Sequence, residues 1–228
     1  MFDVLKFISM KTENLELKDS IKKVGDDYIF LFDIDDTLYK SSYEFKKIQL
    51  KSYVDVYNNL RDICGNRDIP PVSAGLIENS LYSETFSKYF NISPIQLESL
   101  RKQIAYKDYL GKEMKLRKKL LSIPFRKWAF TNCVESRARP ILKALGLTDC
   151  FEGVICIDDD SVELIGKPKD SAFEFVEEFL GIENKQKVFF FDDALANIKT
   201  GERFGWRSFH VRKKYNIIDL LEDTLKLI

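Results

Sequence analysis

Five short apolar segments restrict most strongly the folds that are open to this chain. They are rich in aromatic and β-branched residues, as buried strands are. The segments occupy residues 28–34, 127–132, 153–158, 187–193 and 207–211. Their hydrophobicity is nearly continuous, where a half-exposed strand would alternate, and this is typical of parallel strands that are covered on both faces. The pattern therefore predicts a buried parallel sheet.

Amphipathic stretches of helical length follow the last four of these segments. They occupy residues 134–146, 168–181, 194–205 and 216–228. A regular alternation of strand and helix builds parallel sheets with helices on both faces. We therefore predict an α/β fold whose core is a doubly wound, Rossmann-like parallel sheet.

The interval between the first two segments is far longer than one crossover helix requires. It contains amphipathic stretches at 42–60, 72–90 and 93–104. The last of these begins with Ser93 as N-cap and Pro94 at the first helical position. We expect a helical cap domain at 39–111, inserted into a core made of 1–38 and 112–228. The first 25 residues are expected to form a loosely attached helix.

Composition excludes several classes of function. Lys plus Arg and Asp plus Glu both total 36, so no net field draws the chain to nucleic acid or to an anionic membrane. The single histidine, His210, disfavours both a histidine-activated nucleophile and a histidine-rich zinc site. The four cysteines show no CxxC spacing, the N-terminus is charged, and no apolar run approaches the roughly 20 residues of a membrane span. We expect a soluble, cytoplasmic protein with a small-molecule partner.

Carboxylates stand at the ends of two predicted strands. Asp33 ends the first segment, and Asp192 and Asp193 end the fourth. Ligands bind outside the carboxyl ends of parallel strands, so neighbouring strands would bring these groups together. Two unit charges 4 Å apart repel by about 4 kcal/mol at an effective dielectric of 20, so the cluster needs a cation or protons. An all-oxygen donor set predicts Mg²⁺. Asp35, just beyond the strand, suits a carboxyl group that protonates a leaving group.

Four motifs in this chain resemble those of the haloacid dehalogenase superfamily, in the same order. They are FDIDDT at 32–37, AFTN at 129–132, GKPKDSAF at 166–173 and FFFDDALAN at 189–197. Any one of them would be weak evidence, but four in order at the ends of predicted strands are strong evidence. The resemblance implies a Mg²⁺-dependent phosphatase that works through an aspartyl-phosphate intermediate.

The resemblance also implies roles for single residues. Asp33 would attack phosphorus, and Asp35 would protonate the leaving oxygen and then accept a proton from water. Thr131 and Lys167 would hold the phosphoryl oxygens, with Lys169 as the alternative to Lys167. The implied metal ligands are Asp33, the Asp35 backbone carbonyl and Asp192, with Asp193 behind them.

Longer stretches resemble the pyrimidine 5′-nucleotidase branch of that superfamily, which acts on pyrimidine nucleoside 5′-monophosphates. They include FDIDDTLYKSS at 32–42, LGLTDCFEGV at 145–154 and DDALANIKTGERFGW at 192–206. In the cap, LYSETF at 81–86 differs from the YYKEYG-like segment of such members but keeps its tyrosine and glutamate. The implied substrate-binding residues are Thr131, Asn132, Lys167, Tyr82 and Glu84. The alternatives are a phosphatase of sugar phosphates or another small metabolite, a phosphomutase, and a catalytically silent phosphate-binding scaffold.

Overall fold

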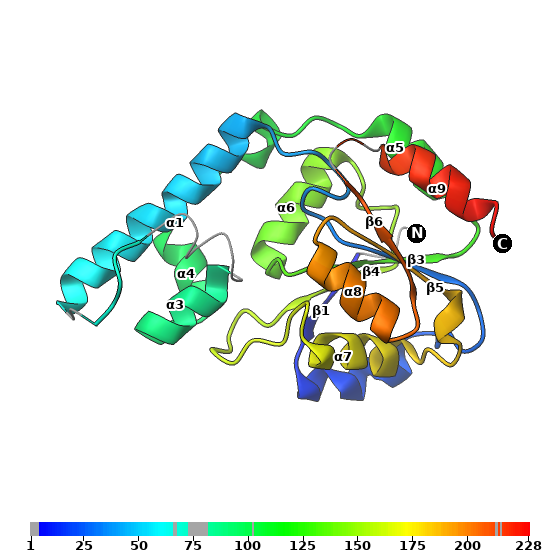
Figure 1. Ribbon diagram of the computed structural model, residues 1–228, viewed down its shortest axis with the longest axis horizontal. Helices are drawn as coiled ribbons and strands as arrows, with labels where there is room; N and C mark the ends of the chain where they lie inside the picture. The colour runs from blue at the N-terminus through cyan, green and yellow to red at the C-terminus, as the bar shows by residue number, and fades with distance from the viewer. Residues whose placement is uncertain (1–4, 66–67, 73–81, 102, 213, 215) are drawn as a thin grey trace.

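A six-stranded parallel sheet forms the centre of the molecule. The computed structural model describes residues 5–65, 68–72, 82–101, 103–212, 214 and 216–228. The strands are β1 (Lys6–Met10), β2 (Ile29–Phe32), β3 (Arg126–Phe130), β4 (Gly153–Ile157), β5 (Val188–Asp192) and β6 (Arg207–His210). Their order is β1-β4-β3-β2-β5-β6, and every neighbouring pair is parallel. From β2 the chain adds β3 and β4 on one side, and β5 and β6 on the other (Figure 1). The predicted doubly wound core is confirmed.

The N-terminal segment differs from the predicted helix. Residues 6–10 form the edge strand β1, which pairs with β4 from Lys6–Gly153 to Met10–Ile157. A 3₁₀ helix, η1 (Thr12–Ser20), follows it. In β1 only Ile8 and Met10 are buried, so the apolar alternation is too short to stand out beside the charged residues around it.

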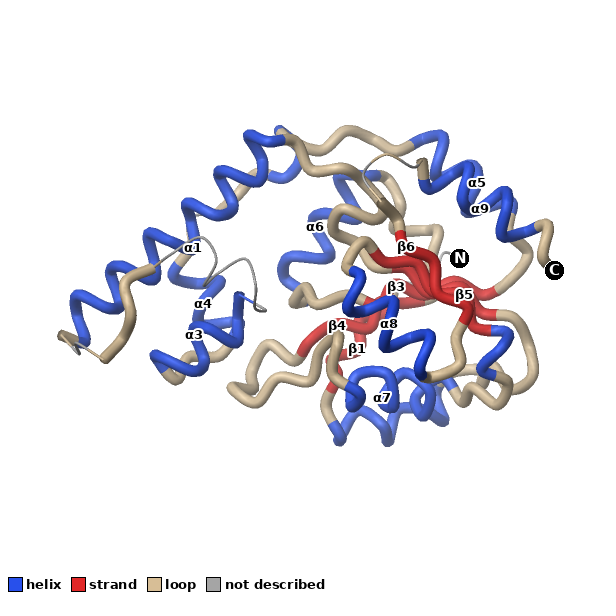
Figure 2. The backbone as a smooth tube through the Cα atoms, viewed as in Figure 1, coloured by secondary structure: helices blue, strands red, loops and turns tan. Residues whose placement is uncertain are grey.

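Helices cover both faces of the sheet. The helices α5 (Met114–Ser122), α6 (Glu135–Leu145) and α9 (Ile217–Leu225) pack on the face that carries Phe30 and Phe32. The opposite face, which carries Leu31 and Phe190, is covered by η1, α7 (Asp170–Leu180) and α8 (Leu195–Arg203). Figure 2 shows the strands between these two helical layers. Burial of the strands on both sides explains their nearly continuous hydrophobicity.

A helical cap is inserted after β2. Its described helices are α1 (Tyr43–Cys64), α3 (Tyr82–Phe90) and α4 (Pro94–Leu100), and they lie together beside the sheet (Figure 1). Tyr57, Phe86 and Leu97 belong to a hydrophobic cluster of the cap that is separate from the two clusters of the core. The capping box of α4 has Ser93 as N-cap, with Pro94 in the first turn, as predicted. The boundaries at 39 and 111 remain a prediction.

Short 3₁₀ helices complete the described elements, η2 (Tyr106–Asp108) after α4 and η3 (Lys185–Lys187) before β5. Among the described helices, none combines the length and the apolar content that are needed to cross a membrane.

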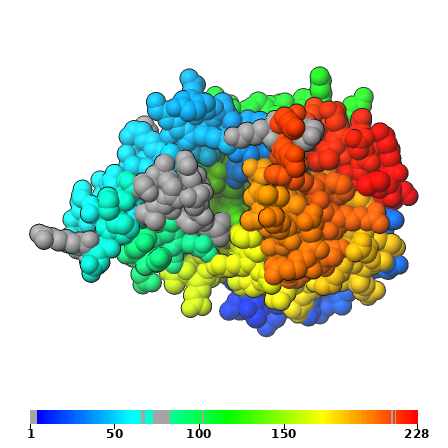
Figure 3. Space-filling model, viewed as in Figure 1, coloured from blue at the N-terminus to red at the C-terminus, as the bar shows by residue number. Residues whose placement is uncertain are grey.

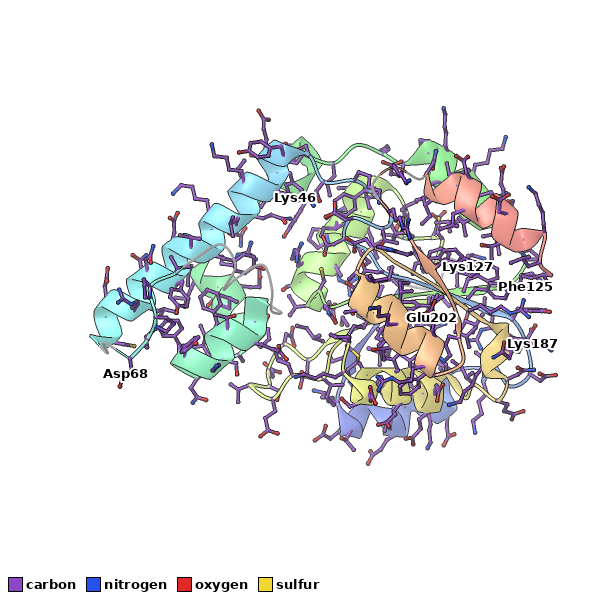
Figure 4. All side chains as sticks on the ribbon, in the orientation of Figure 1. Lys46, Asp68, Phe125, Lys127, Lys187 and Glu202 are labelled. Atoms are coloured by element: carbon purple, nitrogen blue, oxygen red, sulfur yellow. The ribbon has the colours of Figure 1, made fainter. Side chains whose placement is uncertain are left out.

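Polar contacts hold the cap to the loops at the carboxyl end of the sheet. Lys46, near the core end of α1, donates a hydrogen bond to the carboxylate of Asp36 (Figure 4). Asp68 lies at the far tip of the cap in the same view. The backbone N–H of Ile95 donates to the carbonyl of Asp159 over 2.8 Å. The cap is therefore positioned beside the sheet edge at which the acidic residues gather.

Candidate active site

A pocket of about 210 Å³ lies at the carboxyl ends of β2, β3 and β5. Side chains of the core and of the cap line it: Asp33, Asp35, Thr131, Asn132, Cys133, Val134, Arg137, Asp192, Asp193, Ala194 and Asn197 from the core, with Tyr53, Ser83 and Glu98 from the cap. In Figure 3 a recess is visible between the cap and α8. The structure thus brings six of the sequence-predicted residues to one pocket.

The register of the sheet sets the acidic cluster. Phe32 and Phe191 form the last residue pair between β2 and β5, so Asp33 and Asp192 follow side by side. The N–H of Asp33 donates to the Phe191 carbonyl over 2.9 Å. Carboxylate oxygens of Asp33, Asp192 and Asp193 all lie within 4.8 Å of one another. Such a set of oxygen donors suits a hard divalent cation.

Lys167 lies between two of these carboxylates. Its Nζ donates to Asp33 Oδ1 at 2.9 Å, to Asp192 Oδ2 at 2.6 Å and to the Phe130 carbonyl at 2.6 Å. Burial by itself would lower the pKa of Lys167, but the Asp192 and Asp33 carboxylates outweigh it and raise that pKa. The buried ammonium is therefore charged and fixed against the carboxylates of Asp33 and Asp192, which line the pocket.

Asn132 fixes Lys167 through the backbone. Its Nδ2 donates to the Lys167 carbonyl at 2.8 Å, and its Oδ1 accepts from the Lys167 N–H at 2.9 Å. Thr131 is buried, and its Oγ1 accepts from the Cys133 N–H at 3.1 Å. These contacts keep the two residues after β3 in one conformation at the pocket wall.

Electrostatics in the cluster favour either protons or a cation. Burial raises the pKa of Asp33 well above its usual range, and the Lys167 ammonium only partly opposes this rise. Burial, followed by the Asp192 carboxylate, raises the pKa of Asp193 to about 6. Asn197 orients Asp192, because its Nδ2 donates to both carboxylate oxygens at 3.0 Å. A bound cation would relieve the same repulsion that these protons relieve.

Asp35 is held by three neighbours. Its carboxylate accepts hydrogen bonds from Tyr39 Oη at 2.5 Å, Cys133 Sγ at 2.8 Å and Arg137 Nη2 at 2.8 Å. Burial, with the Asp35 carboxylate, raises the pKa of Tyr39. Burial also raises the pKa of Cys133 well above its usual range, so its thiol is protonated and unreactive at neutral pH. Asp35 is thus pre-oriented at the pocket wall.

Sequence reasoning did not identify Arg137 as a functional residue. It lies in the first turns of α6, directly after the AFTN motif, and its side chain is 11% exposed. The available signal was its position: a cation that follows a strand-end motif within two helical turns lies near the same sheet edge. That signal is weak, since Arg139 two positions later is exposed and pairs with Glu135.

The structure does not bring Glu84 to this pocket. Its Oε1 pairs with Lys169 Nζ at 2.5 Å, and both residues line a separate cavity of about 790 Å³. Lys169 is therefore engaged with the cap, while Lys167 contacts the acidic cluster. The side chain of Tyr82 lies outside the described residues. The cap residues that do line the pocket are Tyr53, Ser83 and Glu98.

The family of the chain follows from a sequence comparison. A family model described as haloacid dehalogenase-like hydrolase matches residues 29–205, which is most of the chain. The chain therefore belongs to the haloacid dehalogenase-like hydrolases. The matched range starts at β2 and includes both the cap and the acidic cluster.

The individual relatives share only a small part of their residues with this chain. Phosphate metabolism protein 8 of Saccharomyces cerevisiae is 27% identical over 212 residues, which cover 86% of this chain and 62% of that protein. The chain thus spans less than two thirds of that relative. A HAD family enzyme of Bacteroides thetaiotaomicron is 15% identical, with a TM-score of 0.56 over 85% of this chain and 97% of that one. The same enzyme in complex with magnesium and inorganic phosphate is 17% identical, with a TM-score of 0.53 over 85% and 98%. At these identities the structures show a shared fold.

Proposed function

We propose that this chain is a Mg²⁺-dependent phosphomonoesterase that hydrolyses a small phosphorylated metabolite through an aspartyl-phosphate intermediate. The observation that carries the proposal is the arrangement of Asp33, which lies within one cluster with Lys167 and two further carboxylates. Asp35 lines the same pocket. A structural neighbour of the same fold forms a complex with magnesium and inorganic phosphate. This supports the proposal that a protein of this fold can bind both.

The residues divide the work of phosphoryl transfer. An Asp33 oxygen forms a bond to phosphorus as the bond from phosphorus to the leaving oxygen breaks. Asp35 enters the reaction protonated and gives this proton to the leaving oxygen. The carboxylate that results, which hydrogen bonds from Tyr39, Cys133 and Arg137 stabilise, then takes a proton from the water that hydrolyses the aspartyl-phosphate. Thr131 and Lys167 contact the phosphoryl oxygens, where fixed positive charge and hydrogen-bond donors stabilise the transition state.

The acidic cluster fits Mg²⁺ by the chemistry of its donors. Asp33, Asp192 and the Asp35 carbonyl would hold the ion, with Asp193 behind them. When bound, the ion would supply positive charge that offsets the charges of the nucleophile and the phosphate. Lys167 contributes a further positive charge to two of these carboxylates, Asp33 and Asp192. The buried carboxylates repel one another, so the cluster favours a bound cation. The cation in turn would attract the anionic phosphate.

A pyrimidine nucleoside 5′-monophosphate is the substrate that we favour. The stretches that resemble the pyrimidine 5′-nucleotidase branch support it. Polar cap residues that line the pocket, Tyr53, Ser83 and Glu98, suit a polar leaving group such as a nucleoside.

Phosphate release from nucleoside 5′-monophosphates and sugar phosphates, measured with Mg²⁺ and with chelator, tests the proposal. We expect release only with Mg²⁺, with the highest kcat/KM for UMP or CMP. Asp33→Asn should lower turnover by at least about 10³-fold, because it removes the nucleophile. Asp62→Asn, an exposed position on α1, is the matched control. Unchanged release by Asp33→Asn would overturn the assignment.

A further inference from the structure

Two opposite charges face the same pocket from different parts of the molecule. Glu98 belongs to α4 of the cap, and Arg137 belongs to α6 of the core. Both line the pocket that holds the acidic cluster. They do not pair with each other: Glu98 pairs with Arg101, and Arg137 pairs with Asp35. A ligand between them would therefore meet an acceptor on one side and a donor on the other.

The carboxylate of Glu98 is held rigidly. Arg101 Nη1 donates to Glu98 Oε1 at 2.5 Å, and the Arg101 guanidinium is almost fully buried. Arg101 also donates to Ser52 Oγ at 3.0 and 2.9 Å and to Tyr53 Oη at 2.8 Å, and it stacks 3.7 Å from the centre of the Tyr53 ring. Within the described residues only one oxygen of Glu98 is engaged in this way. The other oxygen can accept a hydrogen bond from a ligand.

Arg137 retains donor capacity. A guanidinium has five N–H donors, and the described structure pairs Arg137 through Nη2 with Asp35. Its Nε is buried and has no hydrogen-bond partner among the described residues. This nitrogen is closed to the pocket, so the donors that a ligand can meet are the remaining N–H groups of the guanidinium, which lines the pocket. Since Asp35 serves the leaving oxygen in the proposed function, Arg137 lies on the leaving-group side of the pocket.

We propose that Glu98 and Arg137 form a specificity subsite that reads a hydrogen-bond donor and a neighbouring acceptor on the leaving group. Glu98 accepts from an N–H or O–H group, and Arg137 donates to an adjacent oxygen or ring nitrogen. The edge of a pyrimidine base offers this pair, as do the hydroxyl groups of a sugar, whereas n-butyl phosphate offers neither. The inference rests on the proposed phosphatase function.

The physical basis of this selectivity is the cost of unpaired polar groups. A site that is built to hydrogen-bond a polar substrate rejects an analogue without those groups, because its own buried donors and acceptors stay unsatisfied. Glu98 is held by buried Arg101 and Arg137 is held by Asp35, so both charged groups stay at the pocket wall, where an apolar leaving group would cover them without hydrogen bonds.

The test compares kcat/KM for UMP, CMP, ribose 5-phosphate and n-butyl phosphate in wild type, Glu98→Gln and Arg137→Met. All four are esters of alkyl alcohols that depend alike on proton donation, so a weakened hold of Arg137 on Asp35 cancels in their ratio. In each variant the ratio of a polar substrate to n-butyl phosphate should fall at least about 10-fold. The ratio is taken within one variant, so a loss of folded protein cancels. Exposed Glu174→Gln and Arg139→Met are the matched controls, and their ratios should equal that of wild type.

Each result has one meaning. A fall for the nucleotides alone identifies the base edge as the recognised group, and an equal fall for ribose 5-phosphate identifies the sugar hydroxyls. An active wild type with unchanged ratios in both variants overturns the subsite and leaves the phosphatase function standing. A wild type that releases phosphate from none of the four substrates overturns the proposed function, and the subsite with it.

Discussion

Replacing Lys167 by methionine tests the electrostatic design of the pocket. Methionine keeps an unbranched stem beside the rings of Phe130 and Phe190, over which the ammonium now lies at 4.8 and 5.4 Å. The change removes the charge that separates Asp33 from Asp192. We expect the variant to fold, to be less stable than wild type, and to regain stability when Mg²⁺ is added.

The size of the effect follows from two contacts. Lys167 Nζ lies 2.9 Å from Asp33 and 2.6 Å from Asp192, and each contact contributes about 6 kcal/mol of Coulomb attraction at an effective dielectric of 20. Desolvation of the buried ammonium offsets much of this attraction. Removing one partner of a buried pair typically costs about 3–5 kcal/mol, because a buried charge is left unpaired. Proton uptake by Asp33, whose pKa burial already raises, favours the lower end of that range.

Urea unfolding near neutral pH, with chelator and then with Mg²⁺, measures these free energies. In chelator we expect Lys167→Met to lose about 3–5 kcal/mol of the free energy of unfolding. Saturating Mg²⁺ should stabilise the variant more than wild type, since the cation replaces the missing charge beside the carboxylates; binding at 100 times Kd contributes about 2.7 kcal/mol.

Lys169→Met is the matched control for this experiment. Lys169 pairs with Glu84, and the two side chains are 49% and 33% exposed, so its removal should cost at most about 1 kcal/mol. The reasoning is refuted if both variants lose the same free energy, or if Mg²⁺ stabilises wild type more than Lys167→Met.

Two further predictions concern the thiols and the packing of the sheet. Burial raises the pKa of Cys156 to about 12, whereas Cys64 is exposed, so iodoacetamide should modify Cys64 in the native protein and Cys156 only after unfolding. Peptide mass spectrometry that finds Cys156 modified first would contradict this. In Gly153→Ala the new Cβ would lie 2.3 Å from buried Trp128, so unfolding experiments should show a loss of about 1–3 kcal/mol. Gly111→Ala, whose Cβ would meet no atom within 4 Å, should change stability by less than about 0.5 kcal/mol; equal losses would disprove the packing argument.

Local signals in the sequence were sufficient for most of the elements. Strands β2, β4 and β5 are nearly continuous apolar runs, and the start of α4 is marked by Ser93 and Pro94. The edge strand β1 carries no such signal, because only Ile8 and Met10 of its five residues are buried. Its strand conformation depends on pairing with β4, a partner more than a hundred residues away along the chain.

The candidate site shows the same division between local and distant causes. The positions of Asp33 and Asp192 could be predicted, since each ends a recognisable strand. The pairing of Glu84 with Lys169 could not be predicted, and it keeps Glu84 out of the pocket for which the sequence selected it. Likewise the contact of Arg137 with Asp35 joins residues 102 positions apart and has no local signature.

The amino-acid sequence by itself determined the parallel α/β core and the acid-bearing strand ends, because burial and strand termination are encoded within a few consecutive residues. Only the tertiary structure decided that β2 and β5 are neighbours and that Lys167, 134 positions from Asp33, completes their cluster. It also decided which cap side chains face that cluster. Those outcomes depend on the register and packing of distant segments, and residue order does not specify packing locally.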